Sequence, residues 1–306
     1  MNFLERSFDQ TNRWWRYAIV CLGALVVFPA IGTIPLTITI LLSSPSTGEG
    51  INAMSGITGD LSATGISKNL MLVMLMLSTV ITLALTVPLV RMLHGRKFSE
   101  VINGTAKIRF DRCLTGGGVW FVLMAMMYAA DYLVNGEDYI LQFDASRFIP
   151  LVAISILLIP FQTTSEEFLF RGYLAQGVAA WSRRPWVALV VPSVVFGLMH
   201  AFNPEVIEYG FWATMPQYIY IGLFLGLVAV LDDGIELSIG IHAANNIFLS
   251  IFATSGSSVF QTDALLEVIN INPGKDSVLV IVMSLFAGAY FARKYNWDFS
   301  LLLKKL

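Results

Sequence analysis

The sequence predicts an all-α, polytopic membrane protein with about eight transmembrane helices and both termini in the cytoplasm. Of the 306 residues, 56% are hydrophobic and 13% are charged, whereas soluble domains carry about 25% charged residues. The mean hydropathy is +0.70. Eight apolar runs approach the length of about 20 residues that a membrane-spanning helix needs. The net charge of −2 gives no indication of nucleic-acid binding.

The first apolar run follows a polar, amphipathic segment that ends in Trp14-Trp15-Arg16. The run is longer than the roughly 7–15 apolar residues of a cleavable signal peptide. We therefore expect an uncleaved first helix with the tryptophans at the membrane interface. The fourth helix has the least clear end, because apolar residues continue past Arg171 to about Trp181. The eight helices are expected at about 17–43, 70–93, 117–134, from near 148, 185–202, 216–231, 235–254 and 277–293.

Basic and acidic loops alternate along the chain and predict its orientation. Six Lys and Arg residues lie within 91–112, two more form the pair 183–184, and others follow the eighth helix. By the positive-inside rule these segments, and both termini, are cytoplasmic. The acidic pair Asp232-Asp233 would also lie inside, which is the one feature against this orientation. The acidic or neutral loops expected outside are 44–69, 135–147 and 203–215.

The chain divides into three segments without internal repeats. Segment 1–147 holds the amphipathic N-terminus and the first three helices, 148–255 holds the polar residues described next, and 256–306 holds the last helix and a cytoplasmic tail. The Gly/Ser-rich stretch 44–66 is interpreted as a plain external loop. Cys21 and Cys113 lie far apart, so neither a disulfide framework nor a thiolate metal site is expected.

Ionisable side chains inside the expected spans are the strongest functional signal. Each costs roughly 2.5–3.5 kcal/mol to insert, and such residues usually mark function. Glu167 and Arg171 are four residues apart, share a helix face and are expected to pair. Glu166 lies about 100° around the helix, which leaves it to face a polar cavity. The plainer interpretation is an ion-paired helix end at the cytoplasmic surface.

Two histidines in later helices complete the set of membrane-embedded polar groups. His200 lies four residues after Phe196, and a lone histidine of this kind is more often a packing residue. His242 and Asn246 are also four residues apart. The plainer interpretation of this pair is a hydrogen bond that holds two helices together. Asn245 points to another face and is the weaker candidate. Jointly, a carboxylate, two imidazoles and an amide suffice for hydrolysis by a water that glutamate activates, with His and Asn as oxyanion donors.

The same groups also form a possible metal site. Glu166, His200 and His242 would bind Zn²⁺ and leave one position for water, although the His-Glu-x-x-His helix motif of soluble zinc proteases is absent. We favour a site with no metal or other cofactor. Asparagine is an ordinary oxyanion donor and an uncommon zinc ligand, and no nearby Cys or Asp completes a zinc site.

Three motifs, in order, resemble those of a known family. Glu-Glu-x-x-x-Arg (166–171), Phe-x-x-x-His (196–200) and His-x-x-x-Asn (242–246) are similar to the CPBP family of CAAX prenyl proteases and bacteriocin-processing or immunity proteins, also called Abi. The resemblance covers about 150–255, where "EEFLFRGYL" and "FGLMHAFNP" are typical of bacterial members. It implies an eight-helix intramembrane endopeptidase, of glutamic or metallo type, in a bacterial cytoplasmic membrane.

The resemblance also implies a role for each residue. Glu166 would activate the water and His200 would orient it or donate a proton, while His242 and Asn246 would form the oxyanion hole. The implied substrate is a membrane-associated or lipid-modified peptide or protein, reached among membrane lipids. The supporting residues would be Glu167, Arg171 and Phe196.

Two other functions fit the same residues. A non-catalytic family member could act as a membrane regulatory or immunity partner, and the intact motifs argue only weakly against this. A proton-coupled transporter would also place Glu, Arg and His in its spans. Transporters more often show repeats or broken helices in matching halves, which this sequence lacks.

The depths of the two histidines are hard to reconcile with eight regular spans. At about 1.5 Å per residue, His200 lies about 20 Å beyond Trp186, whereas His242 lies only about 9 Å beyond Glu236. Both helices are expected to run outward. The imidazoles meet only if the fifth helix is tilted, starts deeper in the cytosol or has other boundaries.

Overall fold

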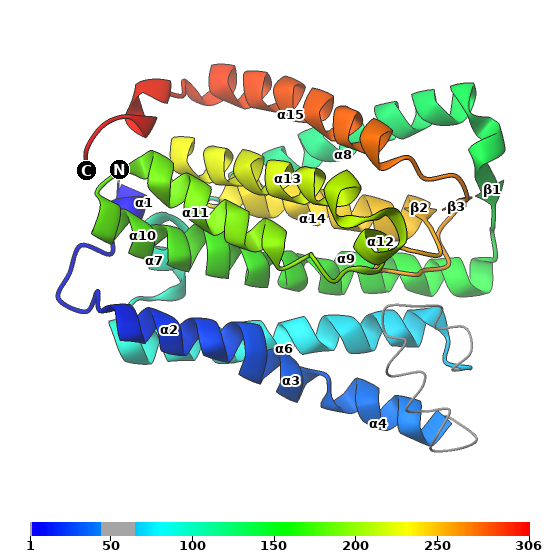
Figure 1. The fold of residues 1–306 in the computed structure, drawn as a ribbon, viewed down its shortest axis with the longest axis horizontal. Coiled ribbons are helices and arrows are strands. Elements are labelled where there is room, and N and C mark those ends of the chain that lie inside the picture. The colour runs from blue at the N-terminus through cyan, green and yellow to red at the C-terminus, as the bar shows by residue number, and fades with distance from the viewer. Residues whose placement is uncertain (1, 44–64) are drawn as a thin grey trace.

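The computed structural model describes residues 2–43 and 65–306 and is mostly helical (Figure 1). The predicted external loop 44–66 therefore lies almost wholly outside the described residues. The helices are α1 (Asn2–Glu5), α2 (Trp14–Leu22), α3 (Phe28–Gly32), α4 (Ile34–Ser43), α6 (Lys68–His94), α7 (Phe98–Asn103), α8 (Phe110–Val134), α9 (Ala145–Glu167), α10 (Ala175–Ser182), α11 (Pro185–Leu198), α12 (Pro204–Tyr209), α13 (Phe211–Leu231), α14 (Glu236–Phe252) and α15 (Pro273–Tyr295). Shorter π or 3₁₀ segments are η1 (Gly23–Val27), η3 (Gly136–Asp138), η4 (Phe168–Leu174) and η5 (Phe299–Leu302), and the strands are β1 (Tyr139–Leu141), β2 (Ala253–Thr254) and β3 (Leu266–Val268).

All eight expected helices are present, but six within the described residues are long and apolar enough to cross a membrane. The chain is thus an integral membrane protein, whereas the count of eight spans is not established. The helices that fall short are α11, with 14 residues, and α14, with 17. The six candidate spans are Trp14–Leu42, Lys68–His94, Phe110–Val134, Ala145–Ser182, Phe211–Leu231 and Pro273–Tyr295.

The fifth helix ends earlier than the expected 185–202. It stops at Leu198 and passes into a turn in which the His200 N–H donates to the Gly197 carbonyl, 3.0 Å away. Pro204 then opens α12, and proline keeps the preceding residue, Asn203, in an extended conformation. His200 therefore lies in the turn after α11 rather than inside a helix.

Both termini lie at the same end of the molecule, and the three strands lie at the opposite end (Figure 1). The Leu306 N–H donates to the Arg183 carbonyl, and the Phe3 N–H donates to Oδ1 of Asp233. The turn that holds Asp233 therefore shares this end with the basic pair 183–184. The cytoplasmic location of this end stays a prediction.

The acidic pair that opposed the predicted orientation is balanced by basic residues. Arg112 Nη1 lies 2.6 Å from Oδ1 of Asp232, and Arg109 Nη2 lies 3.3 Å from Oδ2 of the same carboxylate. Arg109 also pairs with the fully buried Glu236 at the start of α14. The charge of Asp232 in this turn is thus offset by two arginines.

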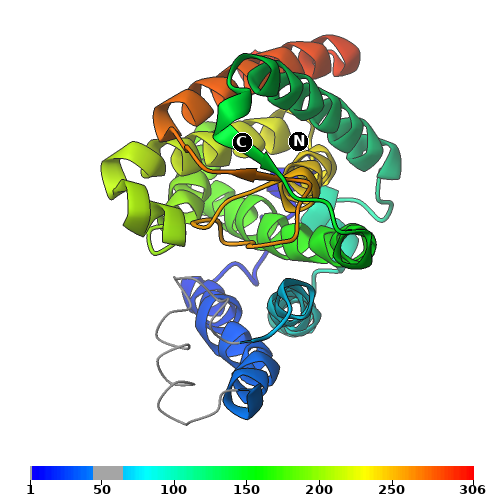
Figure 2. The same cartoon turned by 90° about the vertical axis from the view of Figure 1, so that its right-hand side faces the viewer.

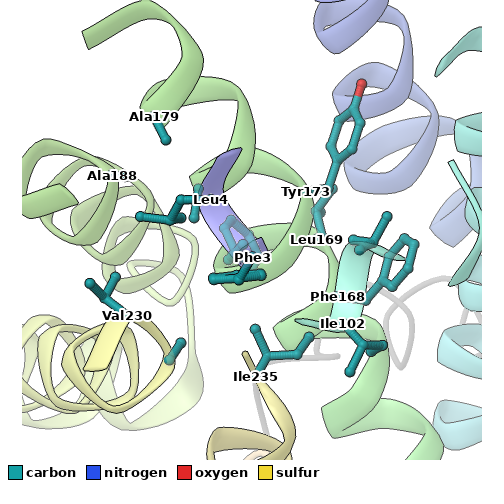
Figure 3. Close-up of a cluster of buried hydrophobic side chains, with 14 of the residues drawn as sticks. Phe3, Leu4, Ile102, Phe168, Leu169, Tyr173, Ala179, Ala188, Val230 and Ile235 are labelled. Atoms are coloured by element: carbon teal, nitrogen blue, oxygen red, sulfur yellow. The ribbon is translucent and has the colours of Figure 1, made fainter. Parts of the chain in front are cut away.

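The N-terminal segment is built into the protein core at this end. Phe3 and Leu4 are both 0% exposed. Figure 3 shows them within a cluster of buried side chains contributed by several helices, among which Tyr173, Val230 and Ile235 are labelled. The segment was expected to be polar and amphipathic, but its apolar side packs against protein.

The helices form two unequal layers. Helices α2–α4 and α6 lie on one side, and the remaining long helices lie on the other (Figures 1 and 2). Between α8 and α14 the backbones approach closely, because a Cβ atom at Gly116 or Gly240 would clash with a carbonyl oxygen of the other helix. Small residues permit this kind of close helix packing in membranes. The contact positions α14, which carries His242 and Asn246.

Within the described residues, a small sheet departs from the expected all-α fold. Its order is β1-β3-β2, with β1 antiparallel to β3 and β2 parallel to it. Tyr139 pairs with Val268 and Leu141 with Leu266. Strands of two or three residues leave no detectable alternation in the sequence, which explains why they were not expected.

Candidate active site

The two glutamates lie where one long helix changes its winding. Glu166 and Glu167 are the last residues of α9, and the next seven residues form the π-helical segment η4, which contains Arg171. The helix then continues as α10 to Ser182, as the unbroken apolar run past Arg171 indicated. Single π turns inside α-helices frequently occur at functional sites.

Glu167 connects the first and third motifs. Its Oε1 accepts hydrogen bonds from Arg171 Nη1 and from His242 Nδ1, each 2.8 Å long. The Glu167 side chain is 0% exposed and the Arg171 side chain 1%. The predicted Glu167–Arg171 pair is therefore present and buried, and it has an imidazole from α14 as a third member.

Phe196 brings the second motif to the same place. The Arg171 guanidinium carbon lies 3.9 Å from the centre of the phenyl ring. The His200 ring lies 4.6 Å and the His242 ring 6.0 Å from that ring, centre to centre. The two histidines thus share a neighbour, so the structure brings them together despite the difference in depth expected from the sequence.

Glu166 is held differently from Glu167. Its side chain is 28% exposed, and its Oε1 accepts a 2.5 Å hydrogen bond from Gln162 Nε2. Its Oε2 lies 3.7 Å from His242 Nε2, which is too long for a direct hydrogen bond. As predicted, Glu167 is the neutralised carboxylate and Glu166 is the more accessible one.

The hydrogen-bond partners of the two histidines determine which nitrogen is available for chemistry. His200 Nδ1 lies 2.8 Å from the Phe196 carbonyl oxygen, which can only accept, so Nδ1 carries a proton. His242 Nδ1 faces the Glu167 carboxylate in the same way. In both rings Nε2 is therefore the nitrogen left for proton exchange with a substrate or water.

Asn246 is connected to Glu166 through a residue that the sequence analysis did not select. Asn246 Nδ2 donates to Gln162 Oε1 over 3.0 Å. Gln162 lies four residues before Glu166 on α9, so helical spacing could have identified it. Asn245, judged the weaker candidate, donates to Asn246 Oδ1 over 3.1 Å and belongs to the same network.

Tyr218 of α13 contacts the other face of the site. Its ring stacks on His200 with 4.5 Å between ring centres and an interplanar angle of 22°. Its hydroxyl donates to Glu205 and accepts from Asn203 Nδ2. No spacing rule links Tyr218 to His200, because they are joined only by tertiary packing.

The possible zinc ligands are not arranged as a metal site. Within residues 2–43 and 65–306, no three His, Cys, Asp or Glu side chains form a group that could hold a metal ion. Glu166, His200 and His242 are therefore not gathered as a ligand set in the described part of the chain. Cys21 and Cys113 are both free thiols.

The fold and the site define a class, namely polytopic helical membrane proteins with a buried site of glutamate, histidine and asparagine. A family model described as "Type II CAAX prenyl endopeptidase Rce1-like" matches residues 146–248, which include all three motifs. The chain is also 32% identical over 295 residues to the uncharacterised protein YyaK of Bacillus subtilis (strain 168), covering 94% of this chain and 95% of that protein. No solved structure matches. The chain belongs to the Rce1-like family of type II CAAX prenyl endopeptidases, which is part of the CPBP family.

Proposed function

We propose that the protein is an intramembrane endopeptidase that hydrolyses a peptide bond in a membrane-associated or lipid-modified peptide or protein. The observation that carries this proposal is the difference between adjacent carboxylates. Glu167 is buried between Arg171 and His242, whereas the 28%-exposed Glu166 faces His242 Nε2 across 3.7 Å. The family match supports proteolysis at the level of the family.

The nucleophilic water would lie beside Glu166 Oε2, because the Gln162 hydrogen bond engages Oε1 and leaves this oxygen to act as the base. Glu166 accepts a proton from the water as its oxygen attacks the scissile carbonyl carbon. The proton then passes to the leaving amine, directly or through His200 Nε2. One water is consumed, and an acid and an amine are formed.

The oxyanion would be bound by His242 and Asn246. Asn246 Nδ2 carries two protons, one donated to Gln162 and the second left for the substrate. A doubly protonated His242 would donate from Nδ1 to Glu167 and from Nε2 to the oxyanion. Donors placed where negative charge develops are often worth 10²–10³ in rate, roughly.

We further propose that the chemistry needs no metal. Each group of the mechanism has a hydrogen-bonding role that the described contacts support, and an asparagine amide suits an oxyanion better than zinc. The orientation proposed here places both termini in the cytoplasm of a bacterial cell. It is supported by the gathering of the basic pair 183–184 and both termini at one end of the molecule.

The function is tested by quantitative peptidomics of membranes from cells that express the wild-type protein or Glu166→Gln. This substitution keeps the shape and removes the base. We expect peptides that the wild type releases to disappear in the variant, and purified wild-type protein in lipid nanodiscs to cut the same sequences. Identical peptide profiles, together with a cellular phenotype that Glu166→Gln retains, would instead support a non-catalytic regulatory or immunity partner.

A further inference from the structure

Five side chains form a continuous chain of hydrogen bonds that ends on Glu166. Trp120 Nε1 donates to Asn245 Oδ1 over 3.2 Å, and Asn245 Nδ2 donates to Asn246 Oδ1 over 3.1 Å. Asn246 Nδ2 donates to Gln162 Oε1 over 3.0 Å, and Gln162 Nε2 donates to Glu166 Oε1 over 2.5 Å. The chain crosses from α8 through α14 to α9. We call these five residues the amide relay.

The direction of the amide relay is fixed at both ends. The indole N–H of Trp120 can only donate, and Oε1 of Glu166 accepts the hydrogen bond from the Gln162 amide. The amide oxygen and nitrogen of Asn and Gln are assigned from the hydrogen bonds they make. Here both ends require the same assignment, because flipping any one of the three amides would place donor against donor and acceptor against acceptor.

The start of the amide relay is anchored in the protein core. Trp120 is 0% exposed and stacks on Phe224, with 5.7 Å between ring centres. Close backbone contact between α8 and α14 at Gly116 and Gly240 fixes the distance that the Trp120–Asn245 bond spans. The relay therefore begins at a helix contact where the two backbones approach closely.

We propose that Trp120 and Asn245 are positioning residues that act on Glu166 and Asn246 through this relay. The proposal rests on the proposed function. The Gln162 bond occupies Oε1 of Glu166, so Oε2 is the oxygen left to act as base beside His242. The Asn245 bond holds the Asn246 carboxamide, so its second N–H is presented in one orientation. A group misplaced by about 1 Å can cost 10²-fold in rate.

Two substitutions break the relay while preserving the surrounding shape. Trp120→Phe keeps an aromatic ring against Phe224 and removes the first donor. Asn245→Asp still accepts from Trp120 and cannot donate to Asn246. Phe224→Leu is the matched control, because it loosens the packing of Trp120 and breaks no hydrogen bond of the relay.

The kinetic test uses purified protein in nanodiscs and an internally quenched peptide that spans a cleavage site found by the Glu166-dependent peptidomics. Trp120→Phe and Asn245→Asp should each lower kcat by roughly 10–100-fold with KM changed less than about twofold. Because the relay acts as a unit, Trp120→Phe in a Gln162→Ala background should cost little more than Gln162→Ala alone. The proposal would be overturned if the losses of kcat caused by Trp120→Phe and Gln162→Ala multiplied in the double variant. An equal loss of kcat in Phe224→Leu would overturn it as well.

A second measurement needs no substrate. The infrared carboxylate band of Glu166, isolated as the difference between wild type and Glu166→Gln, should shift in Trp120→Phe and in Asn245→Asp and stay in place in Phe224→Leu. If one relay variant fails to fold, the other decides the outcome. Shifted bands with no cleavage in any preparation would sustain the relay and reject the protease. Unshifted bands in an active enzyme would reject the relay alone.

Discussion

His242 donates from Nδ1 to Oε1 of Glu167 over 2.8 Å, and this contact joins the third motif to the first. The same oxygen accepts from Arg171. The second glutamate of the doubled pair is therefore not a spare base. It holds α9 and α14 together and fixes the imidazole that faces Glu166, so the two adjacent carboxylates divide structural and chemical work between them.

Removing the Glu167 charge should cost stability as well as activity. Glu167→Gln leaves the Arg171 guanidinium buried without a counter-ion, and breaking a buried pair in this way costs about 3–5 kcal/mol. Thermal unfolding of the purified protein in detergent measures this. The control is Glu166→Gln, whose side chain is partly exposed and should change the melting temperature little. Equal melting temperatures for the two variants would contradict the assignment of Glu167 as the structural carboxylate.

Arg171→Ala should lower yield and thermal stability more than it alters substrate choice. The guanidinium is 1% exposed, pairs with Glu167 and lies on the ring of Phe196. Its loss leaves the buried Glu167 carboxylate with His242 as its remaining partner, and breaking a buried ion pair costs about 3–5 kcal/mol. Expression level, melting temperature and the range of peptides released should be compared with wild type. An unchanged melting temperature with an altered peptide range would show that Arg171 selects substrates instead.

Tyr218 should affect cleavage through the position of His200. His200→Ala removes the group proposed to handle the proton and should abolish cleavage with folding retained. Tyr218→Phe keeps the stacked ring and loses only the hydroxyl bonds, whereas Tyr218→Leu loses the stack. We expect activity in the order wild type, Tyr218→Phe, Tyr218→Leu, measured as kcat on the quenched peptide. Cleavage by His200→Ala at the wild-type rate would remove His200 from the mechanism.

Motif spacing predicted the residues of the site better than it predicted their surroundings. The Glu167–Arg171 pair follows from a four-residue interval on one helix, which is local geometry. The 3.6-residue periodicity could not show that α11 ends at Leu198, because apolar residues continue to Phe202. Nor could the periodicity show that the rings of His200 and His242 both lie against Phe196.

Contacts between different helices were beyond the reach of the sequence. Gln162 lies at helical spacing from Glu166, but an uncharged amide is a weaker functional signal in a membrane span than an ionisable side chain. Trp120 and Tyr218 gave no signal, since their partners lie 125 and 18 residues away in the chain. Helical geometry places Asn245 on a different face from Asn246, which made it the weaker candidate. Its side-chain amide nevertheless donates a hydrogen bond to Oδ1 of Asn246.

The zinc content of the active protein distinguishes the metal-free glutamate mechanism from the metallo-type mechanism. We expect elemental analysis of active, purified protein to give far less than one zinc per chain, and chelators to leave cleavage unchanged. The reason is that Glu166, His200 and His242 do not form a group that could hold a metal ion within the described residues. One zinc per active chain, lost together with activity on chelation and restored by zinc alone, would establish the metallo-type mechanism.

The close approach of α8 and α14 should be sensitive to a single methyl group. A Cβ at Gly240 of α14 would overlap the carbonyl oxygen of Cys113 on α8. A Cβ at Gly118, which lies on α8, meets nothing within 4 Å. Gly240→Ala must push the helices apart and should destabilise the protein by about 1–3 kcal/mol. It should also lower kcat, because Trp120 and Asn245 move apart together with their helices. Gly118→Ala should be neutral or stabilising by up to about 1 kcal/mol, since alanine favours helix over glycine. Melting temperature and kcat of the two variants check this, and a Gly240→Ala protein that unfolds and cleaves like Gly118→Ala would show that the helix contact does not hold the site.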